Sequence, residues 1–355
     1  MTIAIDCRMI NSSGIGVYLK GCLPYFLQSN NIFILVGDSK QLQSYQSFLN
    51  VKIINCNVKT FSISELFFFP SFIKKQINSS DVFYSPFFNI PCGIKVSIFT
   101  TIHDIIFPDM PELSTKVGLA VRMRYFRRAF KKSKKIFTVS QFSKLRIERH
   151  LGTQKQITVT HSAIRPVFLD FKASLKNIQK KETIVFIGNI KKHKGLGCLL
   201  NAFIQAKKDG LPHKLVIIGN NENLRSKDIT ILNKIDSIKN DSIYFTGLVS
   251  DETLMEYLSS ASLLVQPSFY EGFCLPPLEA MVLGTHALVS DIPVLKEIYY
   301  NFPVTFFKTG DSNDLKEKMM ELLYNKSAPF VSLPEQLVFK YTFDKAASII
   351  LENLY

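Results

Sequence analysis

Residues 262–281 read SLLVQPSFYEGFCLPPLEAM, which describes an apolar strand, a turn and the start of a helix. Pro277 suits the first helical position, because the N–H that proline lacks would have no partner there. Gly272 lets a ligand approach the backbone closely. The N–H groups from 273 to 278 would form an anion site at the helix N-terminus, suited to a diphosphate. The binding residues predicted in this turn are Gly272, Phe273, Cys274 and Leu275.

Two carboxylates flank the turn, Glu271 before it and Glu279 in the first turn of the helix. Neither suits a phosphate, because like charges repel, but carboxylates accept hydrogen bonds from sugar hydroxyls. A phosphate site on backbone amides with hydroxyl-binding acids on either side indicates a nucleotide sugar. The alternative for Glu279 is a residue that only matches the helix dipole.

Apolar runs recur along the whole chain, with helical patterns between them. Nearly continuous apolar runs are typical of strands buried on both faces of a parallel sheet. The clearest helix has apolar residues at 196, 199, 200, 203 and 204, one face of a 3.6-residue period. This alternation predicts parallel α/β sheets. The runs are 2–6, 32–36, 52–55, 82–84, 96–102, 136–140, 157–160, 183–187, 214–218, 242–246, 262–266, 287–290 and 304–306.

The α/β pattern begins again near Thr183. The segment before it, 169–182, contains four lysines and few large apolar side chains, so we expect a linker between two doubly wound domains. Ligands of such sheets bind at the carboxyl ends of the strands. With two domains present, the cleft between them is the expected site.

A second strand-to-helix segment, 186–195, reads FIGNIKKHKG. Gly188 and Asn189 end the strand, and Lys194 comes just before the next helix. A lysine at this point can stabilise a diphosphate leaving group by its charge. The alternative is an exposed lysine, which is the interpretation we favour for Lys191 and Lys192.

Two candidate segments lie in the first half of the chain. His103 and Asp104 follow an apolar strand, although most such histidines are structural. Gly14 and Gly16 lie in the stretch NSSGIGVY, 11–18, where backbone amides could approach an anion. The third glycine of a dinucleotide fingerprint is missing, so NAD binding is poorly supported. Tyr18 is expected to pack in the core.

These motifs resemble the retaining GT4-type glycosyltransferases, whose signature is a pair of glutamates separated by seven residues. The resemblance is most specific over 243–285 and weaker elsewhere, and Asn189 stands where many relatives have arginine. It implies that Glu279 binds the ribose hydroxyls and that Glu271 lies against the donor sugar. It also implies that Lys194 meets the diphosphate and that His103, with Asp104 as an orienting partner, reaches the donor sugar.

The resemblance also implies the GT-B fold, two Rossmann-like doubly wound parallel-sheet domains facing a central cleft. The expected limits are 1–168 for the acceptor-side domain, 169–182 for the linker, 183–338 for the nucleotide-sugar domain and 339–355 for a helix crossing back to the first domain. Enzymes of this type retain anomeric configuration without a metal or other cofactor, since lysine and helix N-termini offset the leaving-group charge. The sequence has no Asp-x-Asp motif that would bind one.

The formal net charge is +14, and eight basic residues crowd into 122–135. This cluster is either a solvated helix face or a surface that contacts anionic lipid headgroups. Six scattered cysteines without a C-x-x-C pair fit a reducing cytosol. The first residues, MTIAID, predict a strand rather than a signal peptide. We therefore expect a cytoplasmic protein, in contact with the inner face of the membrane under the second interpretation.

The segments Gly-Asn-x-x-x-His-Lys, 188–194, and Ile-His-Asp, 102–104, resemble those of enzymes of bacterial surface-polysaccharide assembly. This resemblance implies a GDP-mannose donor and a glycan or lipid-linked glycan acceptor in O-antigen, capsule or lipopolysaccharide synthesis. A transferase that uses a dTDP- or UDP-sugar remains open, and so does a nucleotide-sugar epimerase. A nucleic-acid-binding module is the non-enzyme rival. It would need aromatic residues interleaved with the basic cluster, and those present, Tyr125, Phe126 and Phe130, suit a core equally well.

Overall fold

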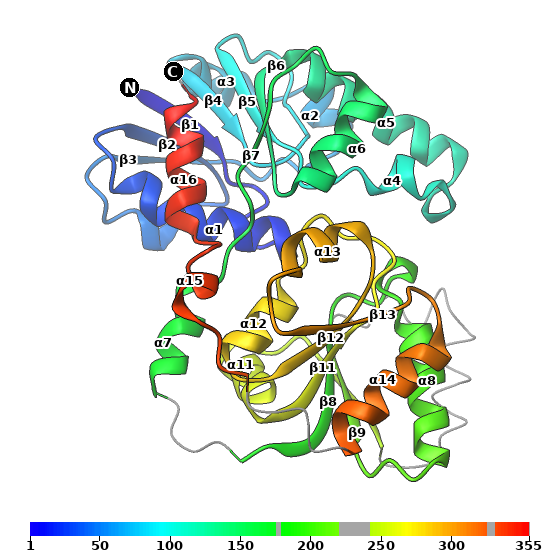
Figure 1. Ribbon diagram of the computed structural model, residues 1–355. Helices are drawn as coiled ribbons and strands as arrows, with labels where there is room; N and C mark the ends of the chain where they lie inside the picture. The colour runs from blue at the N-terminus through cyan, green and yellow to red at the C-terminus, as the bar shows by residue number, and fades with distance from the viewer. Residues whose placement is uncertain (175–178, 220–241, 325–330, 355) are drawn as a thin grey trace. The chain divides into compact units, whose positions relative to one another are not determined.

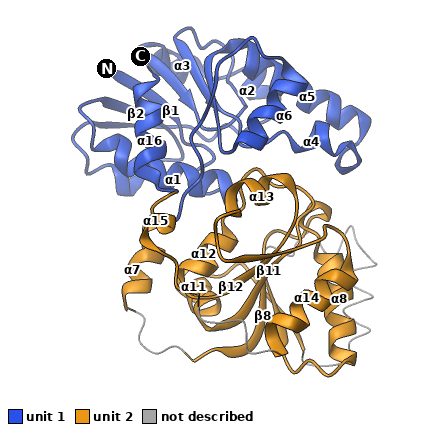
Figure 2. Cartoon of the chain, viewed as in Figure 1, with its two compact units in different colours: residues 1–165, 341–355 blue, residues 166–340 orange. Residues whose placement is uncertain are grey.

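The computed structural model describes residues 1–174, 179–219, 242–324 and 331–354 (Figure 1). The chain forms two compact units, which are coloured separately in Figure 2. Unit 1 contains Met1–Arg165 together with Tyr341–Tyr355, and unit 2 contains Pro166–Lys340.

Unit 1 is built on a parallel sheet of seven strands in the order β3-β2-β1-β4-β5-β6-β7. The strand order reverses direction between β1 and β4, so the carboxyl ends of these two strands flank the topological switch point of the sheet. The strands are β1 (Thr2–Asp6), β2 (Ile32–Gly37), β3 (Val51–Asn55), β4 (Val82–Ser85), β5 (Ser97–Thr101), β6 (Ser133–Thr138) and β7 (Ile157–Val159).

Helices cover this sheet and bury a core rich in isoleucine and phenylalanine. The last helix of the chain belongs to unit 1 and packs on the first, where Phe343 contacts Gly21 so closely that a Cβ on Gly21 would lie 2.4 Å from its ring. The helices are α1 (Ser13–Leu27), α2 (Ile63–Phe67), α3 (Ser71–Asn78), α4 (Ile106–Asp109), α5 (Lys116–Lys132), α6 (Gln141–Leu151) and α16 (Phe343–Glu352).

The described part of unit 2 contains a parallel sheet of six strands in the order β10-β9-β8-β11-β12-β13. β8 and β11 are hydrogen-bonded neighbours at its centre, so the loops that follow their carboxyl ends lie side by side. The strands are β8 (Lys181–Ile187), β9 (Lys214–Ile218), β10 (Ile243–Gly247), β11 (Ala261–Gln266), β12 (His286–Ser290) and β13 (Val304–Phe307).

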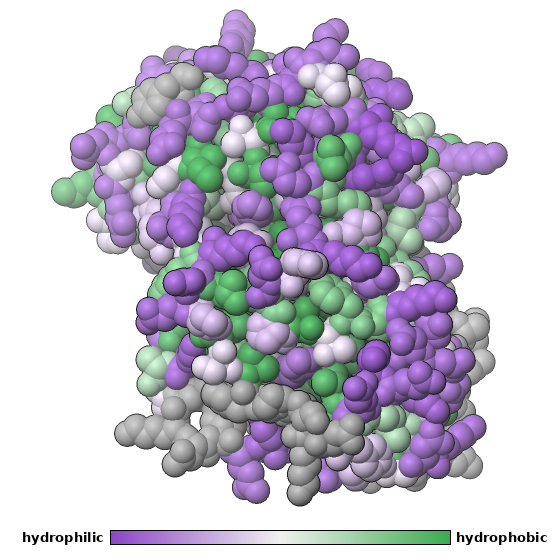
Figure 3. Space-filling view, viewed as in Figure 1, coloured by the Kyte–Doolittle hydropathy of each residue, from purple (hydrophilic) through white to green (hydrophobic). Residues whose placement is uncertain are grey.

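The predicted apolar stripe forms one face of the helix after β8, whose residues Leu196, Leu199 and Phe203 are fully buried. This helix and the helix after β13 pack together, and the surface over them is mostly hydrophilic (Figure 3). Ser250 caps another helix by accepting a hydrogen bond from the N–H of Thr253. The helices are α7 (Pro166–Ser174), α8 (Leu196–Lys208), α11 (Asp251–Ser260), α12 (Pro276–Val282), α13 (Pro293–Tyr299), α14 (Ser312–Tyr324) and α15 (Glu335–Val338).

Two all-parallel α/β units confirm the predicted fold class, but the limits of the units differ from those expected. α7 occupies the first part of the expected linker, 169–182, and β8 begins at Lys181. α7 packs against α12 of unit 2, and its Phe168 is fully buried. Residues 175–178 of the linker lie outside the described residues. No described helix has both the length and the apolar character needed to cross a bilayer.

Candidate active site

The loop after β11 holds the carboxylate of Glu271 by a relay of hydrogen bonds. The amide Nε2 of Gln266, the last residue of β11, donates to the hydroxyl of Ser268 at 2.9 Å, and that hydroxyl donates to Glu271 Oε1 at 2.7 Å. All three residues are buried. The rigid end of a central strand therefore positions the carboxylate.

Lys194 reaches the same carboxylate from the loop after β8. Its Nζ lies 2.7 Å from Oε1 and 2.9 Å from Oε2 of Glu271. The backbones of the two loops are also joined, since the N–H of Phe269 donates to the carbonyl of His193 at 2.7 Å. Lys194 and Glu271 were predicted as separate site residues and are 77 residues apart in the sequence. In the structure they form one ion pair.

Gly195 makes this close approach of the loops feasible. Its φ of +71° lies in the left-handed region, and a Cβ there would lie 1.8 Å from the carbonyl oxygen of Pro267. Any other residue would clash with the backbone as well as being strained. Gly188 lies beside the pair, because a Cβ on it would be 3.7 Å from the side chain of Lys194. The predicted residues Gly188, Lys194 and Glu271 are therefore neighbours.

The ion pair is charged at neutral pH. Burial favours the neutral form of Glu271, but the charge of Lys194 and the hydrogen bonds from Lys194 and Ser268 outweigh it and lower the pKa of the carboxyl. Burial, assisted by the charge of Lys194, lowers the pKa of His193 to about 4. His193 is consequently neutral, and the cation of this loop pair is Lys194.

The turn between Glu271 and α12 differs in one respect from its prediction. Pro276, not Pro277, is the first residue of the helix, so Pro occupies both of its first two positions. Neither has an N–H, and the N–H of Glu279 is bonded to the carbonyl of Leu275 at 3.1 Å. The N-terminus of α12 therefore has fewer free N–H groups than the sequence predicted over 273–278. Its contribution to an anion site is correspondingly smaller.

The two glutamates of the signature lie on either side of Cys274. This residue has a φ of +75° and is buried, and its carbonyl accepts a hydrogen bond from the hydroxyl of Tyr299. Burial raises the pKa of the Cys274 thiol, and the charges of Glu271 and Glu279 raise it further. The carboxylates of Glu271 and Glu279 are both buried.

In unit 1, the ring of His103 is fixed and neutral. Its Nε2 lies 3.0 Å from the carbonyl oxygen of Pro86, which can only accept, so Nε2 carries the hydrogen. Burial lowers its pKa to about 4 against the opposing effect of that hydrogen bond. The rings of His103 and Tyr18 pack edge to face, with their centroids 5.0 Å apart. Asp104 accepts the N–H of Ile106 at 3.1 Å.

The two predicted glycines of unit 1 lie in the first turn of α1 rather than in the loop before it. A Cβ on Gly16 would lie 2.3 Å from the carbonyl oxygen of Ile10, whereas a Cβ on Gly14 would meet nothing within 4 Å. Gly16 therefore serves the close packing of the preceding turn. Tyr18 is buried and hydrogen-bonded to Thr160 at 2.7 Å, which confirms its expected place in the core.

The sequence did not predict the supporting roles of Gln266 and Ser268. The available signal was a polar residue, Gln266, at the end of an otherwise apolar strand, where a buried amide needs a partner. Within the described ranges, no three His, Cys, Asp or Glu side chains gather closely enough to bind a metal ion.

Solved structures with the same two-unit fold are glycosyltransferases of the GT-B class. HepE of Anabaena, solved with UDP and glucose, superposes with a TM-score of 0.74 at 16% identity, over 100% of this chain and 99% of that one. Sucrose-phosphate synthase of Thermosynechococcus elongatus gives a TM-score of 0.78 at 14% identity, over 99% of this chain and 98% of that one.

A family model matches one part of the chain, within unit 2. Residues 168–337, a little under half of the chain, match the model described as "Glycosyl transferases group 1". By fold, the chain is similar to solved glycosyltransferases of the GT-B class.

Two bacterial mannosyltransferases are among the curated relatives. "O-antigen chain mannosyltransferase B" of Escherichia coli is 28% identical over 228 residues, 61% of this chain and 58% of that protein. "O-antigen chain mannosyltransferase RfbU" of Salmonella typhimurium is 28% identical over 212 residues, 57% of this chain and 54% of that protein. The matched regions span little more than half the length of these relatives.

Proposed function

We propose that this protein transfers a hexose from a nucleotide-sugar donor to a glycan or lipid-linked glycan acceptor, with retention of anomeric configuration. The observation that carries the proposal is the ion pair of Lys194 and Glu271 at the carboxyl ends of two central strands. A nucleotide sugar combines an anionic diphosphate, which needs a cation, with a hydroxyl-rich sugar, which needs acceptors. The ion pair offers both, an ammonium group and a carboxylate.

Unit 2 supplies the donor-binding residues in this proposal. The ammonium group of Lys194 offsets the negative charge that develops on the leaving diphosphate. The carboxylate of Glu271 accepts hydrogen bonds from the sugar hydroxyls, and Glu279 accepts those of the ribose. Gly188 and Asn189, together with the turn from Gly272 to Leu275, line the path of the donor.

Retention follows from a front-face displacement. The bond between the anomeric carbon and the diphosphate oxygen breaks, and the acceptor oxygen forms its bond on the same face. The leaving diphosphate oxygen takes the acceptor proton, so no strong protein base is needed. His103 carries a lone pair on Nδ1, because its hydrogen is on Nε2, and we assign this atom to a hydroxyl of the donor sugar. The charge of Lys194 makes a metal ion unnecessary in this mechanism.

GDP-mannose is the donor that we favour, because two relatives are named as O-antigen mannosyltransferases. A UDP-sugar is the second candidate, since HepE, of similar fold, was solved with UDP and glucose. A dTDP-sugar is the remaining alternative. We propose a cytoplasmic protein that meets a lipid-linked acceptor at the inner face of the membrane.

Seven of the eight residues of the predicted basic cluster, 122–135, fall into two groups. Arg122 lies over the ring of Phe107 and bonds to Ser114, and Arg128 bonds to backbone carbonyls of 90 and 91. These residues stabilise the fold. The exposed members, which we propose contact anionic headgroups, are Arg124, Arg127, Lys131, Lys132 and Lys134.

A panel of GDP-, UDP- and dTDP-sugars tests the proposal, with donor hydrolysis and thermal stability as readouts. We expect one nucleotide class to stabilise the protein and to be hydrolysed slowly, because a ligand that binds only the folded state raises its melting temperature. Hydrolysis with retention gives the α-anomer from an α-linked donor, which NMR distinguishes. Formation of an epimerised nucleotide sugar without any acceptor would contradict the proposal.

A further inference from the structure

Helix α2 of unit 1 has its polarity reversed. Its one acidic residue, Glu65, is completely buried, whereas Ile63 and Phe67 are 71% and 64% exposed. An amphipathic helix on the surface of a protein ordinarily buries the apolar residues and exposes the charged one. The orientation of α2 therefore has a specific cause.

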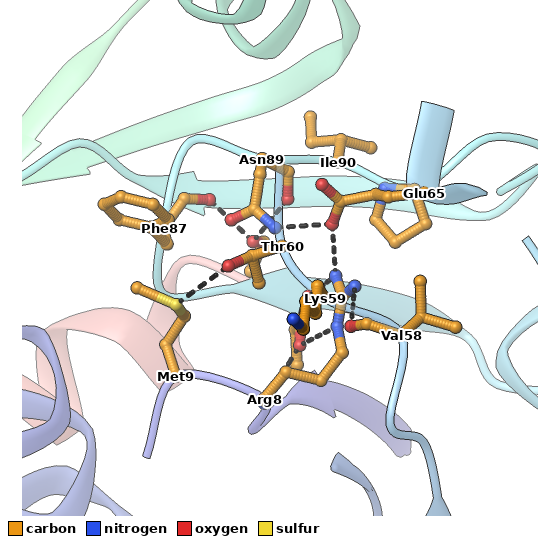
Figure 4. Close-up of polar contacts among 12 residues, drawn as sticks. Arg8, Met9, Val58, Lys59, Thr60, Glu65, Phe87, Asn89 and Ile90 are labelled. Carbon is orange, nitrogen blue, oxygen red and sulfur yellow. Dashed lines mark hydrogen bonds and ion pairs between the residues drawn. The ribbon is translucent and has the colours of Figure 1, made fainter. Parts of the chain in front are cut away.

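The cause is a buried network that holds the carboxylate of Glu65 (Figure 4). Arg8 Nη2 lies 2.6 Å from its Oε1, and the same guanidinium pairs with Asp6. The amide of Asn89 donates to Oε1, and the N–H of Phe61 donates to Oε2 at 2.7 Å. A buried charge is tolerated only with partners of this kind. The core of unit 1 thus fixes α2 with its apolar side outward.

The exposed apolar surface continues beyond α2. Ile63 and Phe67 are one helical turn apart and lie on the same side. The rings of Phe67 and Phe68 have centroids 6.4 Å apart, and Phe68 and Phe72 are 74% and 66% exposed. We call Ile63, Phe67, Phe68 and Phe72 the aromatic surface. An exposed cluster of large apolar residues marks a protein or membrane contact.

The charge around the aromatic surface decides between these partners. Between 57 and 79 the basic residues are Lys59, Lys74 and Lys75, and the only acid is the buried Glu65. Phe61 joins this region to the basic helix α5, since its ring lies 5.2 Å from that of Tyr125. Exposed apolar rings on a segment whose accessible charges are all cationic match a bilayer that contains anionic lipid. A second copy of the chain, with a formal net charge of +14, would be repelled.

We propose that the aromatic surface inserts into the interface of an anionic membrane, with the lysines around it and the exposed arginines of α5 on lipid phosphates. The inference rests on the proposal that the acceptor is membrane-linked. Glu65 acts as a positioning residue, because its ion pair with Arg8 keeps Ile63 and Phe67 turned outward. The surface adds an apolar anchor to the electrostatic contact of α5.

The chain contains no tryptophan, so a single introduced tryptophan reports its own surroundings. Phe68→Trp places it in the aromatic surface, and Leu49→Trp, at a fully exposed apolar position of the same unit, is the matched control. With vesicles of phosphatidylcholine and phosphatidylglycerol brominated on the acyl chains, we expect emission from Phe68→Trp to shift to the blue and to be quenched. Leu49→Trp should show neither change. Equal quenching in both variants, or in neither, would overturn the proposal.

Vesicle flotation tests the energetic contribution of the surface. We expect Phe67→Ser with Phe72→Ser to lower the partition coefficient at least about tenfold, because two large apolar side chains are lost from the interface. The control, Leu49→Ser with Leu145→Ser, should bind like wild type. Unchanged flotation of the first double variant would contradict insertion. A wild-type dimer that this variant converts to a monomer would contradict it too, because the occupant would then be a second copy.

Neither readout requires a donor or an acceptor, so the inference and the proposed function fail separately. Both double variants should keep the thermal transition of wild type and its stabilisation by the donor, since all four positions are exposed and lie in unit 1. Glu65→Gln extends the test to the positioning residue. It should loosen α2 and reduce flotation, and Arg8→Met with Glu65→Leu, which removes both charges, should also do so.

Discussion

Replacement of Lys194 by methionine is the change that most directly probes the ion pair of unit 2. At 2.7 Å and an effective dielectric constant of about 20, the Coulomb attraction is roughly 6 kcal/mol. The loss of hydration of Glu271 offsets much of it, and Lys194 is itself about one-fifth exposed. A net loss of about 2–3 kcal/mol therefore remains for Lys194→Met, since it leaves a buried carboxylate without its cation.

Differential scanning calorimetry measures this loss. For a unit of this size, we expect the transition of unit 2 to fall by roughly 4–12 °C. Glu271→Gln provides the other edge of a double-mutant cycle, and the two changes together should cost less than their sum by about 2 kcal/mol. Additive effects would mean that the two groups do not interact in solution and would refute the pairing.

The effect of pH gives a second, qualitative test of the same pair. In wild type the pKa of Glu271 is lowered, so the pair stabilises the fold above the ordinary carboxyl pKa, and this stability is lost as the pH falls through the lowered pKa. In Lys194→Met, burial acts without the opposing cation and raises that pKa. The variant should therefore regain stability between neutral pH and pH 5, whereas wild type should not. Equal pH dependence would contradict the electrostatic explanation.

Three further changes test the support of the site and the state of His103. Gly195→Ala should cost at least about 3 kcal/mol of stability, because its Cβ would collide with the carbonyl of Pro267 in a left-handed conformation; an unchanged denaturation midpoint would contradict this. Tyr299→Phe should cost about 1 kcal/mol and weaken donor binding, because the turn loses the hydrogen bond to Cys274; calorimetry and a donor titration check both. His103, with a pKa of about 4, should not titrate by NMR between pH 5 and 8. Because its unfolded pKa is higher, it favours unfolding as the pH falls from about 6.5 to 4, and His103→Gln should flatten that part of the stability profile.

The sequence predicts the strands well because parallel strands buried on both faces must be almost entirely apolar. The run at 214–218 coincides with β9, and the run at 262–266 differs from β11 by one residue. The run at 136–140 begins three residues too late. β6 starts at Ser133, whose hydroxyl is buried against Thr100 at 2.7 Å. A polar residue paired with a distant polar partner gives no apolar signal.

Of the candidate site, the local pattern predicted which residues lie in the two loops of unit 2, and the structure brings Gly188, Lys194 and Glu271 together. The relay through Gln266 and Ser268 was not predicted, since it depends on side-chain directions that spacing does not fix. The reversed polarity of α2 was also unpredictable. It depends on Arg8, which is 57 residues from Glu65 in the sequence.

Calorimetric titration with nucleotide sugars in the presence of EDTA tests the central claim, that the turn after β11 in unit 2 binds a nucleotide sugar without a metal. We predict that GDP-mannose binds wild type under these conditions and that Glu279→Ala raises the dissociation constant about 10- to 100-fold. This is the loss of affinity expected when a carboxylate no longer accepts hydrogen bonds from ribose hydroxyls. Failure of GDP-, UDP- and dTDP-sugars alike to bind, or identical affinities for wild type and Glu279→Ala, would contradict the account.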